Sequence, residues 1–207
     1  MKNYKAFSKF EKLEFIQDSG VTGFHDRHAM AVYLKALWLN DVDYIELFES
    51  FGDRPHKMIM NKRAFERQKL FGFENFELDE NGWLVKPELL EIERISFKVK
   101  IENHCSNSVS IGKGLNGIWT YDKSYSTGNS GSCCTASIWG SIVDTKEEAI
   151  INGLIGLIEG HKQQRERLFQ KDTCGNYKES YSKEIVRLVQ KELDIRTGKK
   201  AVQLSLF

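Results

Sequence analysis

The chain has 207 residues, of which 41% are hydrophobic, and its 30 Lys and Arg against 29 Asp and Glu give a formal net charge of +1. This size and hydrophobic content suffice for one large or two small domains with a real core, which excludes a disordered chain. The near-zero net charge excludes a polybasic protein, so any contact with nucleic acid must come from local patches. Because the sequence shows no signal peptide and no long apolar run, we expect a cytoplasmic protein with no membrane segment.

Apolar residues recur at helical spacing in the first part of the chain. The stripes are Phe7–Ile16, Met30–Trp38 and Tyr44–Phe51, and they are separated by turn-forming residues at 18–20, 40–41 and 52–55. We therefore predict a helical part over residues 1–73.

Histidine and aspartate residues gather before the second predicted helix. His25, Asp26 and His28, together with His56, offer imidazoles and a carboxylate that can bind a metal or move protons. The alternative interpretation is structural, with Asp26 as the N-cap of the helix. Because no further acidic cluster follows at a recognisable spacing, we favour the capping or surface interpretation and assign no catalytic residue.

The most basic stretch of the chain is residues 57–69. Its basic residues, opposed by Glu66 alone, are Lys57, Lys62, Arg63, Arg67 and Lys69. If residues 61–70 are helical, Lys62, Arg63 and Arg67 lie close to one face, which can meet DNA phosphates. Such contacts are independent of base sequence and sensitive to salt. The alternative is a helix face that is simply solvated.

The period of the apolar residues changes to two from residue 75. Residues 75–78 and 83–86 flank Asn81-Gly82, which predicts a hairpin with a type I′ turn. Residues 95–101 alternate apolar and polar side chains, which predicts a half-buried strand. Further strands are predicted at 118–125 and 136–139, and loops at 103–117 and 126–132.

Two helices are predicted after these strands. Thr145-Lys146-Glu147-Glu148 is a capping box that opens the first helix. His161, Lys162, Arg165 and Arg167 form a second local basic cluster on its polar continuation, and the last helix runs from Tyr181 to near Ile195. The predicted fold class is α+β, with N-terminal helices, a central, mainly antiparallel sheet, C-terminal helices and a flexible C-terminal tail. The predicted boundaries are 1–73 for the helical part, 74–195 for the sheet with its two helices, and 196–207 for the tail.

The four cysteines, Cys105, Cys133, Cys134 and Cys174, contain no CxxC pair. A zinc site assembled from His104, Cys105, Cys133 and Cys174 is the alternative to reduced thiols. Adjacent cysteines chelate one metal poorly, so we predict no structural metal and no cofactor.

One segment in the middle of the chain resembles ParB-like and DNA-methylase-linked proteins of phages and mobile elements. It runs from Gly117-Ile118-Trp119 through Ser137-Ile138-Trp139-Gly140 to Thr145–Ile150, in a strand, strand, helix order. The resemblance implies a role in DNA metabolism. The Asp/Asn-Pro-Pro-Tyr methylase motif and the Gly-Glu-Arg-Arg ParB motif are both absent from the sequence, so the catalytic parts of those families are not implied.

The last five residues are Gln203, Leu204, Ser205, Leu206 and Phe207. They resemble the peptide by which many bacterial replication and repair proteins bind the β sliding clamp, whose pattern is Gln-Leu, then Ser or Asp, then Leu-Phe. All five positions match, and the preceding Arg196-Thr-Gly-Lys-Lys is typical of an exposed linker. The alternative is a final edge strand, in which Val202, Leu204 and Leu206 dock on the protein's own sheet.

These observations predict a noncatalytic DNA-metabolism factor of a phage or mobile element. The resemblance of the tail implies that it docks on the bacterial β sliding clamp, and local basic patches would add contacts to DNA. Two alternatives stay open: a clamp-targeted, nuclease-like enzyme acting on nucleic acid, and a plain protein-interaction module.

Overall fold

The computed structural model describes the chain except for residues 1–3, 19–23, 100–106, 128–130, 172–178 and 199–207, and it describes the backbone alone at 17–18, 24–26 and 167–171. The chain forms two compact units, Met1–Pro87 and Glu88–Phe207. The division therefore follows Pro87, whereas the sequence pattern placed a boundary after residue 73.

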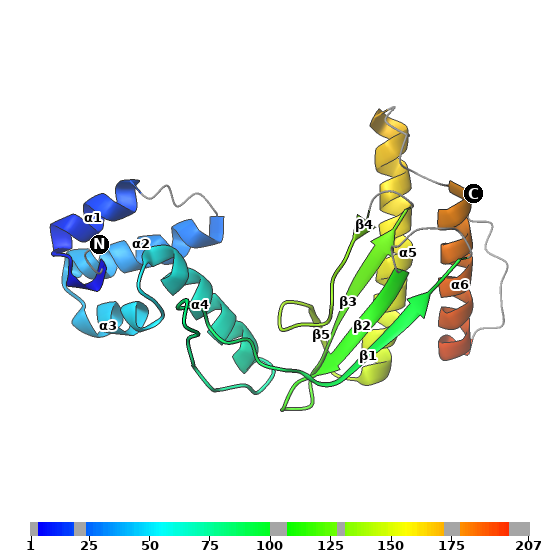
Figure 1. The fold of residues 1–207 in the computed structure, drawn as a ribbon, viewed down its shortest axis with the longest axis horizontal. Coiled ribbons are helices and arrows are strands. Elements are labelled where there is room, and N and C mark those ends of the chain that lie inside the picture. The colour runs from blue at the N-terminus through cyan, green and yellow to red at the C-terminus, as the bar shows by residue number, and fades with distance from the viewer. Residues whose placement is uncertain (1–3, 19–23, 100–106, 128–130, 172–178, 199–207) are drawn as a thin grey trace. The chain divides into compact units, whose positions relative to one another are not determined.

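The first unit is helical, as predicted. Its elements are a 3-10 turn at Tyr4–Ala6 and helices α1 (Lys9–Asp18), α2 (Phe24–Leu39), α3 (Val42–Ser50) and α4 (Pro55–Lys69) (Figure 1). The predicted break at Asn40-Asp41 is confirmed: Asn40 takes a positive φ of 55°, and the Asp41 carboxylate accepts a hydrogen bond from the Tyr44 backbone N–H at 3.2 Å. Pro55 stands at the start of α4, where its missing N–H costs nothing.

Aromatic side chains and one buried ion pair hold this unit together. The Tyr33 and Phe48 rings stack with their centroids 4.7 Å apart. Glu49 Oε1 accepts hydrogen bonds from Lys12 Nζ at 2.6 Å and from the Tyr33 hydroxyl at 2.5 Å. Burial raises the pKa of the Tyr33 hydroxyl above its ordinary range and that of Tyr4 to about 12, so both phenols stay neutral and serve the packing.

The predicted hairpin at Asn81-Gly82 has a different turn and hardly any strand. Only Gly82 takes a positive φ, 75°, and its N–H bonds to the Asp79 carbonyl at 2.9 Å, so the turn is not the type I′ that needs two positive φ values. The flanking segments share a single bridge, Leu78 with Leu84. The buried Asn61 side chain of α4 donates to the Gly82 carbonyl and accepts from the Leu84 N–H, which ties the turn to the helices.

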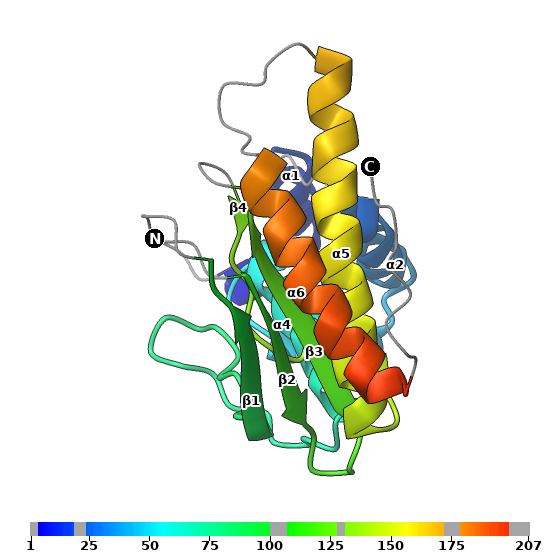
Figure 2. The same ribbon diagram turned by 90° about the vertical axis from the view of Figure 1, so that its right-hand side faces the viewer.

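The second unit is an antiparallel sheet with helices on one face, which confirms the predicted fold class. Its elements are β1 (Leu90–Phe97), β2 (Asn107–Lys113), β3 (Trp119–Ser126), β4 (Gly131–Ser132), β5 (Ser141–Val143), α5 (Lys146–Lys171) and α6 (Glu179–Thr197). The strand order is β1-β2-β3, and β4 and β5 both pair with β3. Figure 2 shows α5 and α6 side by side over the sheet.

Two predictions in this unit were wrong, and the bounds of a third differ from those of the observed strand. Residues 103–117 were predicted as a loop, yet 107–113 form β2, whose Val109 and Ile111 are fully buried against the helices. The strand expected at 95–101 is β1, which begins earlier, at Leu90, and ends at Phe97. Residues 136–139 form a turn, closed by the Gly140 N–H on the Ser137 carbonyl at 3.0 Å, instead of a strand.

The helix α5 lies very close to the sheet. A Cβ atom added at Gly153 would come within 2.3 Å of Val109 Cγ1, so only glycine allows this approach. Thr145 caps the helix as predicted, with its hydroxyl accepting from the Glu148 N–H at 3.1 Å. The buried face of α5 then carries Ile150, Leu154 and Leu157 into the core.

Candidate functional site

The five basic residues predicted to contact nucleic acid lie on or at the end of α4, but they do not share one role. The Lys57 ammonium donates to the Asn81 carbonyl at 2.7 Å, pairs with Asp53 at 3.1 Å and lies over the Trp83 ring. These contacts anchor the turn at residues 79–82. Lys57 is therefore a structural residue of the first unit and stands apart from the other four.

The other four basic side chains remain at least partly exposed. Lys62 pairs with Glu66 one helical turn away, and Arg63 is half-buried. The Arg67 guanidinium lies 5.9 Å from the Phe71 ring centroid and the Lys69 ammonium 5.7 Å from that of Phe65. Arg67 and Lys69 stand in the last turn of α4, where the helix dipole favours cations.

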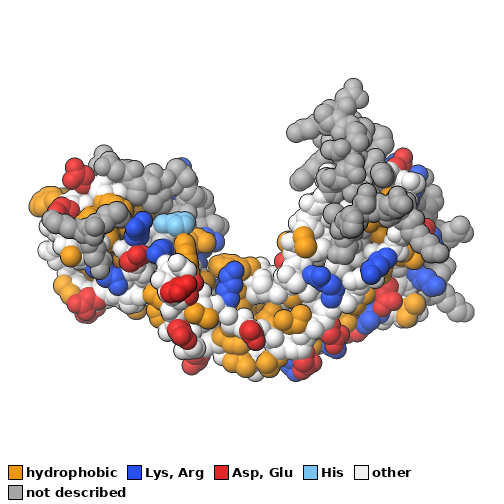
Figure 3. Space-filling view, in the orientation of Figure 1, with side chains coloured by type: hydrophobic (Ala, Val, Ile, Leu, Met, Phe, Trp, Pro, Cys, Tyr) orange, Lys and Arg blue, Asp and Glu red, His pale blue; other side chains and the backbone are white. Residues whose placement is uncertain are grey.

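Basic and acidic side chains are mixed on the face of the described residues that Figure 3 shows. This agrees with the near-neutral composition. Any phosphate contact therefore rests on a small local group such as Lys62, Arg63, Arg67 and Lys69.

The histidines considered as catalytic candidates do not form one cluster among the described side chains. Helix α2 begins at Phe24, so Asp26 lies inside its first turn and not at the N-cap, which corrects the capping interpretation. The side chains of His25 and Asp26 lie outside the described atoms, His28 is exposed, and His56 meets the Trp83 ring edge-on at 5.9 Å. Within the described ranges, no three His, Cys, Asp or Glu side chains are grouped so that they could hold a metal.

The cysteines can be placed only in part. Cys133 and Cys134 are free thiols, the first exposed, next to the hydroxyls of Ser124 and Ser132. His104, Cys105 and Cys174, the other members of the zinc alternative, lie outside the described residues.

His161 was assigned to a basic cluster, and this was wrong, because it is 2% exposed in the core of the second unit. Its Nε2 lies 2.9 Å from Asn107 Oδ1 and its Nδ1 lies 3.2 Å from Ser182 Oγ. Asn107 Oδ1 also accepts from the Ser126 N–H, so Nε2 must carry the ring proton and Nδ1 must accept. Burial lowers the pKa of the His161 imidazole to about 4, which keeps it neutral.

This buried network joins the sheet to both helices. Asn107 Nδ2 donates to the Tyr181 hydroxyl at 2.9 Å, which links β2 to α6. His161 adds α5, and Ser126 adds β3. The alternation of Asn107-Ser-Val-Ser-Ile could have revealed β2. His161 follows Leu154, Leu157 and Ile158 at helical spacing, so the apolar stripe could have placed it on the buried face.

One pocket, of about 360 Å³, lies in the second unit at the edge of β3. We call it the β3 edge groove, and its lining residues are Tyr121, Asp122, Lys123, Trp139, Gly140, Ser141, Asn152, Ile155, Gly156 and Glu159. It exists because β5 pairs with residues 119–121 of β3 and β4 with residues 125–126. Among the described residues, no strand covers Asp122 and Lys123 on this edge.

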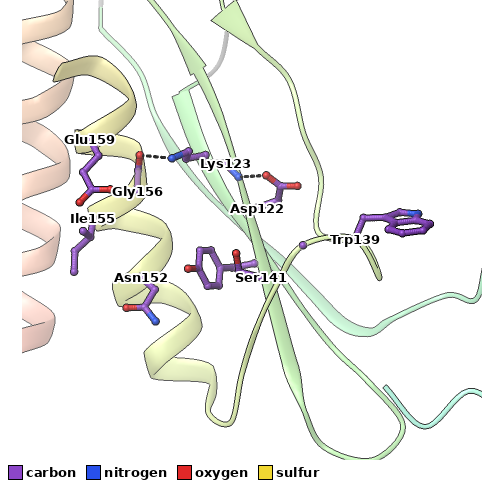
Figure 4. A pocket seen from close by; sticks show the side chains of 10 residues that line it. Asp122, Lys123, Trp139, Ser141, Asn152, Ile155, Gly156 and Glu159 are labelled. Carbon is purple, nitrogen blue, oxygen red and sulfur yellow. Dashed lines mark hydrogen bonds between the residues drawn. The ribbon is translucent and has the colours of Figure 1, made fainter. Parts of the chain in front are cut away.

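The polar groups of the groove are arranged around Lys123. Lys123 reaches across to donate to the Gly156 carbonyl of α5 at 2.6 Å, as Figure 4 shows. Its own N–H is bonded to the neighbouring Asp122 carboxylate at 2.8 Å, which caps the open strand edge. Asp122 points to the side where Trp139 lies, Glu159 is exposed on α5, and Trp139 is 46% exposed. The groove lining thus carries two carboxylates against one ammonium group and has an aromatic border.

Residues 203–207, which resemble the clamp-binding peptide, lie outside the described residues. The structure does show what precedes them. Helix α6 continues to Thr197, and Gly198 follows with a positive φ of 65°, a common way to end a helix. Arg196 pairs with Glu147 of α5 at 3.2 Å, so the end of α6 lies beside the start of α5.

Comparison with protein-family models, with curated proteins and with solved structures finds no match to this chain. No described helix combines the length and the apolarity that crossing a bilayer requires.

Proposed function

We propose that this chain is a noncatalytic DNA-metabolism factor that binds the bacterial β sliding clamp through Gln203, Leu204, Ser205, Leu206 and Phe207. The observation that carries the proposal is the match of all five residues to the clamp-binding pattern. Docking would bring the two folded units to DNA or keep other clients from the same clamp site.

The construction of the second unit supports a separate role for these residues. The α6 side chains in the described core are Tyr181, Ile185, Val186 and Val189, with Leu188 and Leu193 packed beside them. We propose that the apolar side chains of Leu204, Leu206 and Phe207, which follow this helix, are buried in a partner's pocket.

The expected affinity is modest. Burying each of the three large apolar side chains contributes roughly 1.5 to 3 kcal/mol, and ordering each residue costs about 1 to 2 kcal/mol. The ordering cost offsets most of this gain, so we expect weak binding, with a dissociation constant no tighter than about micromolar. Lys62, Arg63, Arg67 and Lys69 of α4 would add weak, salt-sensitive contacts to the DNA that the clamp encircles.

The test is a binding experiment with purified β clamp and two forms of the full chain, the wild type and a form lacking residues 203–207. We expect the wild type alone to bind. Equal binding by both forms would remove the basis of the proposal.

A further inference from the structure

The β3 edge groove offers hydrogen-bond acceptors and an aromatic surface. Lys123 keeps its charge but directs its ammonium to the Gly156 carbonyl, so the carboxylates of Asp122 and Glu159 leave the lining with one more negative than positive charge. Trp139 and Ile155 line it while 46% and 39% exposed. This combination fits an extended segment that carries both ammonium groups and apolar side chains.

A segment of that composition begins within reach of the groove. Lys199, Lys200, Leu204 and Leu206 follow α6, whose Arg196 is held at Glu147 of α5. Along α5, Asn152 is about 8 Å and Glu159 about 18 Å from Glu147, at 1.5 Å per residue. The nine residues 199–207 span up to about 30 Å when extended, enough to follow the whole groove.

We infer that the β3 edge groove is a docking site for residues 199–207 of the same chain. The Lys199 and Lys200 ammonium groups face the two carboxylates of the lining, and the leucines of the segment cover Trp139 and Ile155. The contact need not be strong, because a tethered segment acts at an effective concentration near millimolar.

This docking would regulate the proposed function. The docking itself does not depend on clamp binding, whereas its effect on clamp affinity rests on the proposed function. Leucines held in the groove are withheld from the clamp, so the apparent clamp affinity falls by the fraction of chains in which the segment is free. At a sufficient concentration, the clamp displaces the segment from the groove, because the same side chains bind at both sites.

The experiment compares three full-length chains by NMR. Asp122→Asn with Glu159→Gln removes both negative charges of the groove but keeps their hydrogen-bond acceptors, including the one for the Lys123 N–H. Asp144→Asn with Glu166→Gln is the matched control, since it changes two exposed carboxylates of the same unit outside the groove. The measured quantities are the heteronuclear NOE of the backbone amides of residues 199–207 and the chemical shift of the Trp139 indole N–H.

We expect the wild type and the control to show raised NOE values over residues 199–207 and one common Trp139 shift. The groove variant should lose the raised values and move the indole resonance, and its clamp affinity should rise about two- to tenfold. Low NOE values in the wild type, or values unchanged in the groove variant, would overturn the inference whether or not the clamp binds. If the groove variant changes the NOE values and the Trp139 shift as expected but no form binds the clamp, the docking is supported and the proposed function is contradicted.

Discussion

At the scale of single residues, His161 shows how a polar side chain can hold a core together. The neutral imidazole donates to Asn107 and accepts from Ser182, which fixes α5 against β2 and α6. Protonation would place a second donor against Ser182 and a charge in an apolar interior, so it opposes folding.

A pH dependence of stability follows from this depressed pKa. The folded pKa of about 4 lies below the unfolded value of 6.5, so the unfolded chain binds more protons between these values. Stability from this group is therefore complete above about pH 6.5 and is lost as the pH falls toward 4. Between pH 7 and pH 5 we expect a loss of about 2 kcal/mol in unfolding free energy.

The measurement is urea unfolding of the wild type and of His161→Gln at both pH values. Gln cannot titrate, so the difference in unfolding free energy between the two proteins should shrink at pH 5. A difference that is the same at both pH values would show that His161 is not held neutral by the fold.

At the scale of secondary-structure elements, the contact of α5 with the sheet depends on one glycine. The Cβ of alanine at Gly153 would overlap the buried Val109 side chain, whereas at Gly156 it would meet only the flexible end of Lys123, at 3.2 Å. Overpacking a core costs about 1 to 3 kcal/mol, and replacing a helical glycine by alanine contributes about 0.5 to 1 kcal/mol.

We therefore expect opposite results from two matched substitutions in α5. Gly153→Ala should lower the unfolding free energy by about 1 to 2 kcal/mol net, and Gly156→Ala should leave it unchanged or raise it. Thermal or urea denaturation measures both. Equal effects would mean that α5 does not approach β2 as closely as described.

The helix α4 carries the prediction for DNA. The triple reversal Lys62→Glu, Arg63→Glu and Arg67→Glu should abolish retention of the protein on DNA at low salt, because these cations release counterions from the phosphates. The matched control reverses Lys98, Lys162 and Lys191, three exposed lysines of the second unit, with the same change in net charge. If both triple variants lose retention equally, the effect is one of net charge and α4 is not a specific interface.

Sequence patterns predicted the helices that are amphipathic over several turns. They failed for elements whose structure depends on contacts with residues distant in the sequence. The described α-helices overlap the ranges in which spacing and caps placed them, because a long stripe and a cap such as Thr145 act locally. Two of them begin earlier than expected, α2 before Asp26 and α4 at Pro55. Strand β2 was missed because Ser108, Ser110 and Gly112 resemble loop residues, yet they lie buried inside the sheet. His161 was misassigned because only its charge was considered, although it continues the stripe of Leu154, Leu157 and Ile158. The groove depends on which distant residues meet, which no local pattern encodes.

At the scale of the whole molecule, the chain combines two folded units with residues 203–207, which resemble the clamp-binding peptide. A segment that follows the final helix generally contributes little to the core. We therefore expect changes within residues 203–207 to alter binding without altering the fold.

The most direct test of the proposed function is the clamp affinity and melting temperature of Leu206→Ala with Phe207→Ala, measured beside the wild type. Losing these two side chains should remove at least about 3 kcal/mol of a modest binding energy. We expect clamp binding to disappear while the melting temperature stays within about one or two degrees of the wild type. Unchanged clamp affinity, or no clamp binding by either protein together with a clearly lower melting temperature in the variant, would contradict the assignment.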